Sequence, residues 1–161
     1  MLSHPWRRTV AALPLLAAVC GIGGFQPAAW SQAPTRLVVI SQINVSEKQL
    51  SIDDLRAIFL RKRLVWSGGQ NIVPINQPTG SPVRLVFDRT VLGFNADQVA
   101  RFWIDARIRG GTQAPRSVAG DAMIANVVKV LPGCIGYVPA EQVNAGVRVV
   151  ARIDAGRVLP P

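Results

Sequence analysis

Short apolar runs alternate with amphipathic segments along most of this chain, and this alternation is what most constrains its fold. Brief continuous apolar runs are typical of strands buried in a sheet, and they occur at residues 37–40, 72–75, 135–138 and 147–153. Segments with apolar residues at helical spacing separate them, beginning near residues 51, 81, 95 and 120. The pattern predicts a layered α/β domain with a mixed, mostly parallel sheet of about four to five strands flanked by helices.

Capping residues and helix breakers mark the predicted helix ends. Ser51, with Asp54 three residues later, resembles a capping box, and Asn95 is expected to cap the third helix. Gly93 is expected to end the second helix, and Pro132-Gly133 the fourth. Two further expectations concern the first helix and the second strand. Residues 61–63 are expected to form a solvated basic helix end, with a binding patch as the alternative, and Pro74 marks a sheet edge or a bulge.

The helical spacing also predicts which side chains face the core. In the second, third and fourth helices these are Leu85, Val86, Phe87 and Val91, then Val99, Phe102, Trp103 and Ala106, then Met123, Ile124, Val127 and Val128. Arg101 and Asp105 are spaced for an ion pair on one flank of the third helix. A loop containing Gly110, Gly111 and Pro115 follows that helix and is long enough to have a functional role.

The N-terminus has the layout of a secretory signal peptide. Arg7 and Arg8 precede an apolar run from residue 10 to residue 25, and the small residues Ala29 and Ser31 place the expected cleavage after Ser31. The alternative is a membrane anchor, but the run is shorter than the ~20 residues of a spanning helix and Pro14 interrupts it. We therefore expect residues 1–31 to be a signal peptide, residues 32–161 to form one domain, and no stable membrane span after cleavage. The export route, general secretory or twin-arginine, stays open.

Cleavage would leave few residues suited to catalysis or metal binding. It leaves 161 − 31 = 130 residues and removes His4, the only histidine, and Cys20, one of two cysteines. Triads that use histidine and zinc sites built from histidine or paired cysteine are then impossible. Cys134 is expected to be a small buried residue, and carboxylates such as Asp88 are assigned helix-cap or surface roles. We expect no enzyme, no metal site and no cofactor.

The charge of the expected mature chain is strongly basic. With 18 − 2 basic and 9 acidic residues, the net charge is +7. The export signal and the scarcity of aromatic residues argue against nucleic acid as a partner. The excess favours small anions, lipid headgroups or an acidic partner, and a generally basic solvated surface explains it equally well.

The turn after the second predicted strand is the best candidate site. Ser81 stands where a helix N-cap belongs, Pro82 at the first helical position, and Arg84 in the first turn. The start of a helix presents unpaired N–H groups and the positive end of the helix dipole, which together attract anions. The alternative is that Ser81 only caps its helix.

Four segments in order resemble the phosphate-binding proteins of ABC transporters. They are LSIDDLRAIFLRKRLVWSGG from Leu50, NIVPINQPTGSPVRLVF from Asn71, the helix carrying Phe102-Trp103, and VVKVLPGCIGYVPAE from Val127. The resemblance covers roughly residues 37–141. It implies a periplasmic location and a two-lobed fold that closes over an anion. Because 130 residues match one lobe, the chain is similar to compact single-lobe members of this superfamily.

The resemblance also assigns roles to the turn, with some departures. Ser81 matches the serine of the family's binding loop, whereas Pro82 stands at a glycine, Val83 at a threonine and Asn76 near an arginine. Pro82 offers no N–H, Val83 no hydroxyl and Asn76 no charge. Arg84 in the first helical turn and the hydroxyl of Thr79 can replace part of what these departures remove. The candidate ligand-binding residues are Ser81, Arg84, Thr79, Gly80 and Asn76.

Two functions follow from these observations. The first is an exported solute-binding-type domain that binds inorganic phosphate or a similar oxyanion weakly at the Ser81 helix start. The second is a non-catalytic interaction module of the cell envelope, in which an envelope protein or a second copy of the chain covers the surface that faces the other lobe in relatives.

Overall fold

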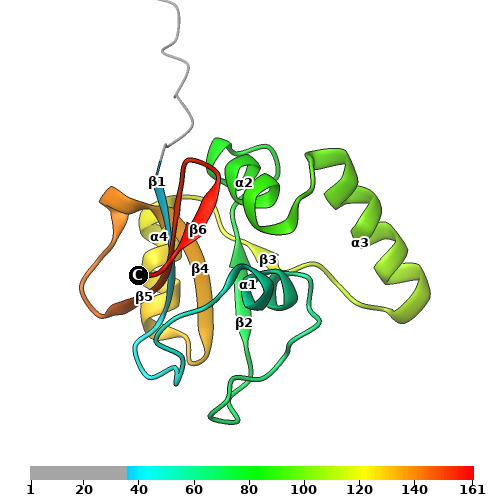
Figure 1. Ribbon diagram of the computed structural model, residues 1–161. Helices are drawn as coiled ribbons and strands as arrows, with labels where there is room; N and C mark the ends of the chain where they lie inside the picture. Colours follow the sequence, from blue (N-terminus) through cyan, green and yellow to red (C-terminus); the bar gives the residue numbers. More distant parts are fainter. Residues whose placement is uncertain (1–35) are drawn as a thin grey trace, which may run out of the picture. The chain divides into compact units, whose positions relative to one another are not determined.

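A computed structural model describes residues 36–161, which form a mixed α/β domain (Figure 1). The predicted signal peptide, its cleavage after Ser31 and the boundary between residues 31 and 32 lie outside the described residues. The described elements, in chain order, are β1 (Arg36–Gln42), α1 (Ile52–Phe59), β2 (Val73–Asn76), α2 (Pro82–Phe87), a π-helical turn (Asp88–Leu92), α3 (Ala96–Gly110), β3 (Arg116–Ser117), α4 (Asp121–Val130), β4 (Cys134–Pro139), a 3-10 turn (Ala140–Gln142), β5 (Val147–Asp154) and β6 (Arg157–Leu159).

The strands form one sheet in the order β3-β2-β4-β1-β5-β6. β2 pairs in parallel with both β3 and β4, whereas the β4–β1, β1–β5 and β5–β6 pairings are antiparallel. The predicted α/β class with a mixed sheet is confirmed. The sheet has six strands instead of four to five, and its parallel part is confined to the β3-β2-β4 end.

Both faces of the sheet are covered by helices. Successive residues of β1 point to opposite sides of the sheet, so each set of side chains packs against different helices. Leu37 and Val39 pack in a core with residues of α1 and α2, including Phe59 and Phe87. Val38 and Ile40 face the other way and pack against α4. The arrangement is a three-layer sandwich, with α1 and α2 on one side of the sheet and α4 on the other.

The predicted capping residues are confirmed at three helix ends. Ser51 with Asp54 forms a capping box at α1, and Asn95 with Gln98 forms one at α3. Gly93 follows the π-helical turn in a left-handed conformation, with φ of 73°. Pro74 also fits its prediction, because β3 pairs only with Ile75 and Asn76, so the β2 edge at Pro74 has no neighbouring strand.

Several sequence predictions were wrong in detail. Leu85 and Met123 are 44% and 54% exposed, so these side chains do not belong to the core. Asp105 pairs with Arg109 instead of Arg101, at 3.5 Å, which places the acid N-terminal to the base as helices favour. Residues 61–63 are less solvated than expected, because Arg63 forms ion pairs with Glu47 and Asp54.

Candidate functional site: the turn after β2

The candidate site lies where two parallel strands end at the same edge of the sheet. Residues 77–81 follow β2 and lead into α2, and residues 118–120 follow β3 and lead into α4. Loops at the carboxyl ends of parallel strands are the usual place for ligands in α/β proteins. The predicted site residues therefore occupy a favourable part of the fold.

Ser81 caps α2 as the sequence predicts. Its Oγ accepts a hydrogen bond from the N–H of Arg84 at 3.2 Å. Pro82 has no N–H, so among the first three residues of this described helix the N–H of Val83 is the donor left for an anion. The helix start supplies few donors.

Arg84 is a buried side chain that holds the turn together. Its Nε donates to Oδ2 of Asp88 at 3.2 Å, and its Nη1 donates to the carbonyl of Gln77 at 2.9 Å and to Oγ1 of Thr79 at 3.3 Å. Arg84 and Asp88 are 6% and 4% exposed. The charge of Arg84 is therefore balanced by a partner four residues away.

Asp88 stands at the C-cap position of α2, within the helix-cap or surface roles predicted for it, but the surface role is wrong because its side chain is buried. Burial raises the pKa of this carboxyl above its usual range, while the charge and hydrogen bond of Arg84 act in the opposite direction. The spacing of Arg84 and Asp88 by four residues on one helix was the available signal for this pair.

Asn76 lies beneath the turn and is bonded within the protein. The Tyr137 hydroxyl donates to Oδ1 of Asn76 at 3.3 Å and accepts from the N–H of Gln77 at 3.3 Å. The Tyr137 ring stacks on Phe87 with centroids 3.8 Å apart, and burial raises the pKa of Tyr137 above its usual range. These contacts fix the end of β2 against the start of α2.

The turn and the start of α4 are also connected. Nε2 of Gln77 donates to Oδ1 of Asp121 at 2.5 Å, and Asp121 stands in the first turn of α4. A carboxylate there already interacts favourably with the positive end of the helix dipole. The start of α4 is therefore less suited to an added anion than the turn before α2.

A hollow of about 200 Å³ lies beside the turn and brings three of the five predicted residues together. Thr79, Gly80 and Arg84 line it, whereas Asn76 and Ser81 are not among its lining residues. Ser117, at the end of β3, adds a hydroxyl that the sequence analysis did not identify, and no sequence motif marks it. Apolar side chains from α3, including Val99 and Trp103, form the opposite wall.

The described residues contain neither a cluster of side chains placed to hold a metal ion nor a helix suited to span a membrane. Residues 36–161 contain no group of three or more histidine, cysteine, aspartate or glutamate side chains placed to hold a metal ion. None of the helices in that range combines the length and apolar character of a membrane span.

Comparison with known proteins identifies the fold and not the family. No protein-family model matches the chain, and no curated protein matches its sequence. Among solved structures, an ABC-type phosphate transport receptor from Vibrio cholerae is similar, with a TM-score of 0.58, 15% identity and coverage of 71% of this chain. A phosphate ABC transporter substrate-binding protein with bound phosphate from Clostridium perfringens has a TM-score of 0.58 at 22% identity over 75% of this chain. PstS from Borrelia burgdorferi has a TM-score of 0.56 at 14% identity over 74%.

The chain spans less than half the length of each of these structures, at 44%, 45% and 48% of their chains. Residues 36–161 therefore have the fold of one lobe of a periplasmic-binding-type protein, as the resemblance in sequence predicted. At these identities the likeness extends to the fold alone.

Proposed function

We propose that this chain is an exported, non-catalytic, solute-binding-type domain of the periplasm that binds phosphate or a similar oxyanion weakly. The ligand occupies the hollow lined by Thr79, Gly80, Arg84 and Ser117. Ser81 and Asn76 act indirectly, because Ser81 caps α2 and Asn76 fixes the end of β2. The likeness to structures of phosphate transport proteins supports this choice of ligand class.

The observation that carries the proposal is the position of Arg84. Its internal hydrogen bonds in the described residues use Nε and Nη1, which leaves Nη2 for a ligand. The Oγ1 of Thr79 accepts from Arg84, so its own proton is available to an oxyanion. Arg84, Thr79, Gly80 and Ser117 line a hollow of suitable size for a tetrahedral anion, and Asp88, the partner of Arg84, lines it as well.

The same geometry limits the affinity. Asp88 balances the charge of Arg84, and no second lobe in the described residues excludes water from the hollow. We expect dissociation constants from high micromolar to millimolar, which correspond to about 4 to 6 kcal/mol.

The test is the melting temperature of the purified protein as a function of added phosphate or sulfate, with chloride at matched ionic strength as the control. We expect a saturable rise with phosphate that Thr79→Val reduces, because the substitution removes one hydroxyl from the hollow. Thr112→Val is the matched control, since Thr112 does not line this hollow. The absence of any rise up to tens of millimolar phosphate contradicts the proposal.

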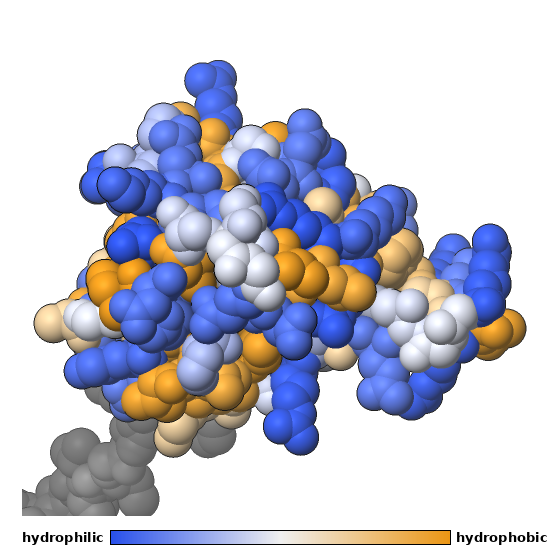
Figure 2. All heavy atoms as spheres, turned by 90° about the horizontal axis from the view of Figure 1, so that it is seen from below, coloured by the Kyte–Doolittle hydropathy of each residue, from blue (hydrophilic) through white to orange (hydrophobic). Residues whose placement is uncertain are grey.

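A second candidate function, an interaction module, rests on α3. Only Val99 of its fifteen residues is buried, and Ile104 and Ile108 are 58% and 77% exposed one turn apart. In Figure 2, hydrophobic residues interrupt the hydrophilic surface at the far right, the side on which α3 lies in Figure 1. Such a face suits an envelope protein or a second copy of the chain. Sedimentation tests the second copy: a monomer at all concentrations contradicts homodimerisation, and a dimer that Ile108→Ser dissociates supports it.

A further inference from the structure

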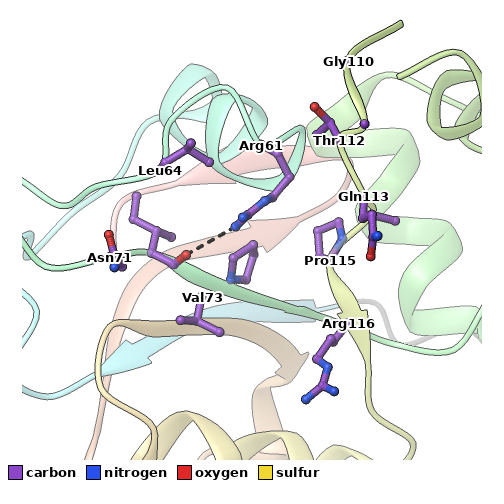
Figure 3. A pocket seen from close by; sticks show the side chains of 13 residues that line it. Arg61, Leu64, Asn71, Val73, Gly110, Thr112, Gln113, Pro115 and Arg116 are labelled. Atoms are coloured by element: carbon purple, nitrogen blue, oxygen red, sulfur yellow. Dashed lines mark hydrogen bonds between the residues drawn. The ribbon is translucent and has the colours of Figure 1, made fainter. Parts of the chain in front are cut away.

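A second hollow, which we call the β2-edge hollow, lies apart from the Ser81 turn (Figure 3). It has a volume of about 770 Å³ and is bounded by the end of α1, the first half of β2 and residues 110–116. It shares only Ala114 and Pro115 with the hollow of the proposed phosphate site. Pockets for small organic ligands have volumes of roughly 300 to 1,000 Å³, and this one falls in that range.

The β2-edge hollow is lined by basic, polar and apolar residues. Arg61 and Arg116 line it, no acidic residue does, and Leu64, Ile72 and Pro74 supply apolar surface. Neither Arg61 nor Arg116 forms an ion pair with a carboxylate of residues 36–161, as is also true of six other arginines in that range. The two unpaired cations give the hollow a positive charge that nothing in its lining balances.

Arg61 is placed there against its local preference. The end of α1 is a Schellman motif, in which the N–H of Lys62 bonds the carbonyl of Ala57 at 2.8 Å and the N–H of Arg61 bonds that of Ile58 at 3.0 Å. The residue at the Arg61 position of this motif has a left-handed conformation and is usually glycine. Arg61 adopts φ of 60° there. A residue that strains its backbone while its side chain enters a hollow is a candidate for function.

The backbone around the hollow disfavours an added β-strand as the occupant. The guanidinium of Arg61 donates from Nη1 to the carbonyl of Ile72 at 3.4 Å, as Figure 3 shows. Pro74, two residues on, has no N–H to donate. A strand pairing with this edge of β2 would have to displace Arg61 from the carbonyl of Ile72, and it would receive no hydrogen bond from Pro74.

We propose that the β2-edge hollow binds a small organic anion, with a carboxylate or phosphate ester group and a short apolar body. Arg61 holds the charged group, with the Thr112 hydroxyl as an additional donor, because the N–H of Gly111 already donates to the carbonyl of Arg107 at 3.0 Å. The apolar body lies against Leu64 and Pro74. This site is independent of the proposed phosphate site and does not require it.

The test uses hexanoate as the probe, with acetate and the neutral hexanamide for comparison, added to the ¹⁵N-labelled full chain. We expect hexanoate to shift the amide signals of Gly111, Thr112 and Gln113 saturably, and to bind more tightly than either comparison compound. Loss of a charge-assisted contact predicts about tenfold weaker binding in Arg61→Gly. Arg89→Gln removes an equal charge from an exposed position outside the hollow and should change the affinity less than about twofold.

The Arg61→Gly variant also separates a binding role from a structural one. Glycine relieves the left-handed backbone, so the melting temperature should stay the same or rise while hexanoate affinity falls. Equal binding of hexanamide, or unchanged hexanoate affinity in Arg61→Gly, overturns the proposal.

Thr112→Val keeps the test valid if Arg61→Gly loses stability, because it leaves the end of α1 intact. It should weaken hexanoate binding and leave phosphate binding unchanged, and Thr79→Val should do the reverse. Hexanoate binding that Thr79→Val weakens and Thr112→Val does not would overturn the assignment to this hollow. Because the two variants give opposite patterns, the two proposals can fail separately.

Discussion

Arg84 and Asp88 form a buried ion pair one helical turn apart, with Nε of Arg84 3.2 Å from Oδ2 of Asp88. The pair places a cation at the turn after β2 and supplies its counter-charge from within the protein. The charge of Arg84 is therefore compensated within the protein, which reduces the attraction of the turn for an anion. This relationship explains both why the turn is ordered and why we expect weak binding.

Removing the acid of this pair should destabilise the domain strongly. Asp88→Asn leaves a buried guanidinium without its counter-charge, which costs about 3 kcal/mol or more of the free energy of unfolding. Asp105→Asn is the control, because Asp105 pairs with Arg109 on an exposed face. Urea unfolding measures both. Equal and small losses in the two variants would show that Asp88 does not stabilise the fold.

Replacing Gly133 by alanine should destabilise the domain much more than replacing Gly93, because only at Gly133 would the added Cβ collide with the backbone. Both residues are left-handed, at φ of 69° and 73°. A Cβ at Gly133 would lie 2.0 Å from the carbonyl oxygen of Asn71, whereas a Cβ at Gly93 meets nothing within 4 Å. Gly93→Ala should cost about 1 kcal/mol of backbone strain. We expect Gly133→Ala to cost several times more, and similar melting temperatures for the two variants would contradict this.

Glu47 should make the domain less stable in acid. Burial by itself would raise the pKa of Glu47, but hydrogen bonds from Ser46 and Ser67 outweigh it and lower the pKa to about 2. Arg63 also lies 2.5 Å from this carboxylate. A lowered pKa in the folded state means that the stabilisation is present above the ordinary pKa of 4.5 and is lost as pH falls toward 2.

The pH dependence can be assigned to Glu47 by substitution. Because solvent screens a network this near the surface, we expect Glu47→Gln to cost about 1 to 2 kcal/mol at neutral pH and to flatten the loss of stability below pH 4.5. Glu141→Gln, at an exposed position, is the control. Unfolding curves measured across this pH range decide the matter. An unchanged acid profile in Glu47→Gln would assign the loss to other carboxylates.

The sequence predicted the fold best where local chemistry decides it. The capping box at Ser51, the cap at Asn95 and the stop at Gly93 depend on residues close in sequence, and all three are confirmed. β6 was missed because its hairpin with β5 turns through Ala155 and Gly156, both at positive φ, and alanine is a weak signal for such a turn. β3 was missed because two residues, Arg116 and Ser117, show no alternation.

The site was only partly predictable, because the sequence indicates local interactions better than contacts between distant segments. The cap role of Ser81 is local, whereas the hollow depends on where α3 and β3 place Trp103 and Ser117. Arg61 was assigned to a solvated helix end, because nothing local indicates that its side chain enters a hollow formed with residues 110–116. Contacts between segments this far apart in sequence need the folded structure.

The most direct test of the central claim is a phosphate titration of the ¹⁵N-labelled protein, followed by NMR at two groups. We predict saturable shifts of the Gly80 amide and of the Arg84 side-chain signals, with a dissociation constant between about 0.1 and 10 mM. The amide of Gly111, in the β2-edge hollow, should shift much less. Signals of Gly80 and Arg84 that do not move, or that move no more with phosphate than with chloride at the same ionic strength, would contradict the assignment of an oxyanion site to this turn.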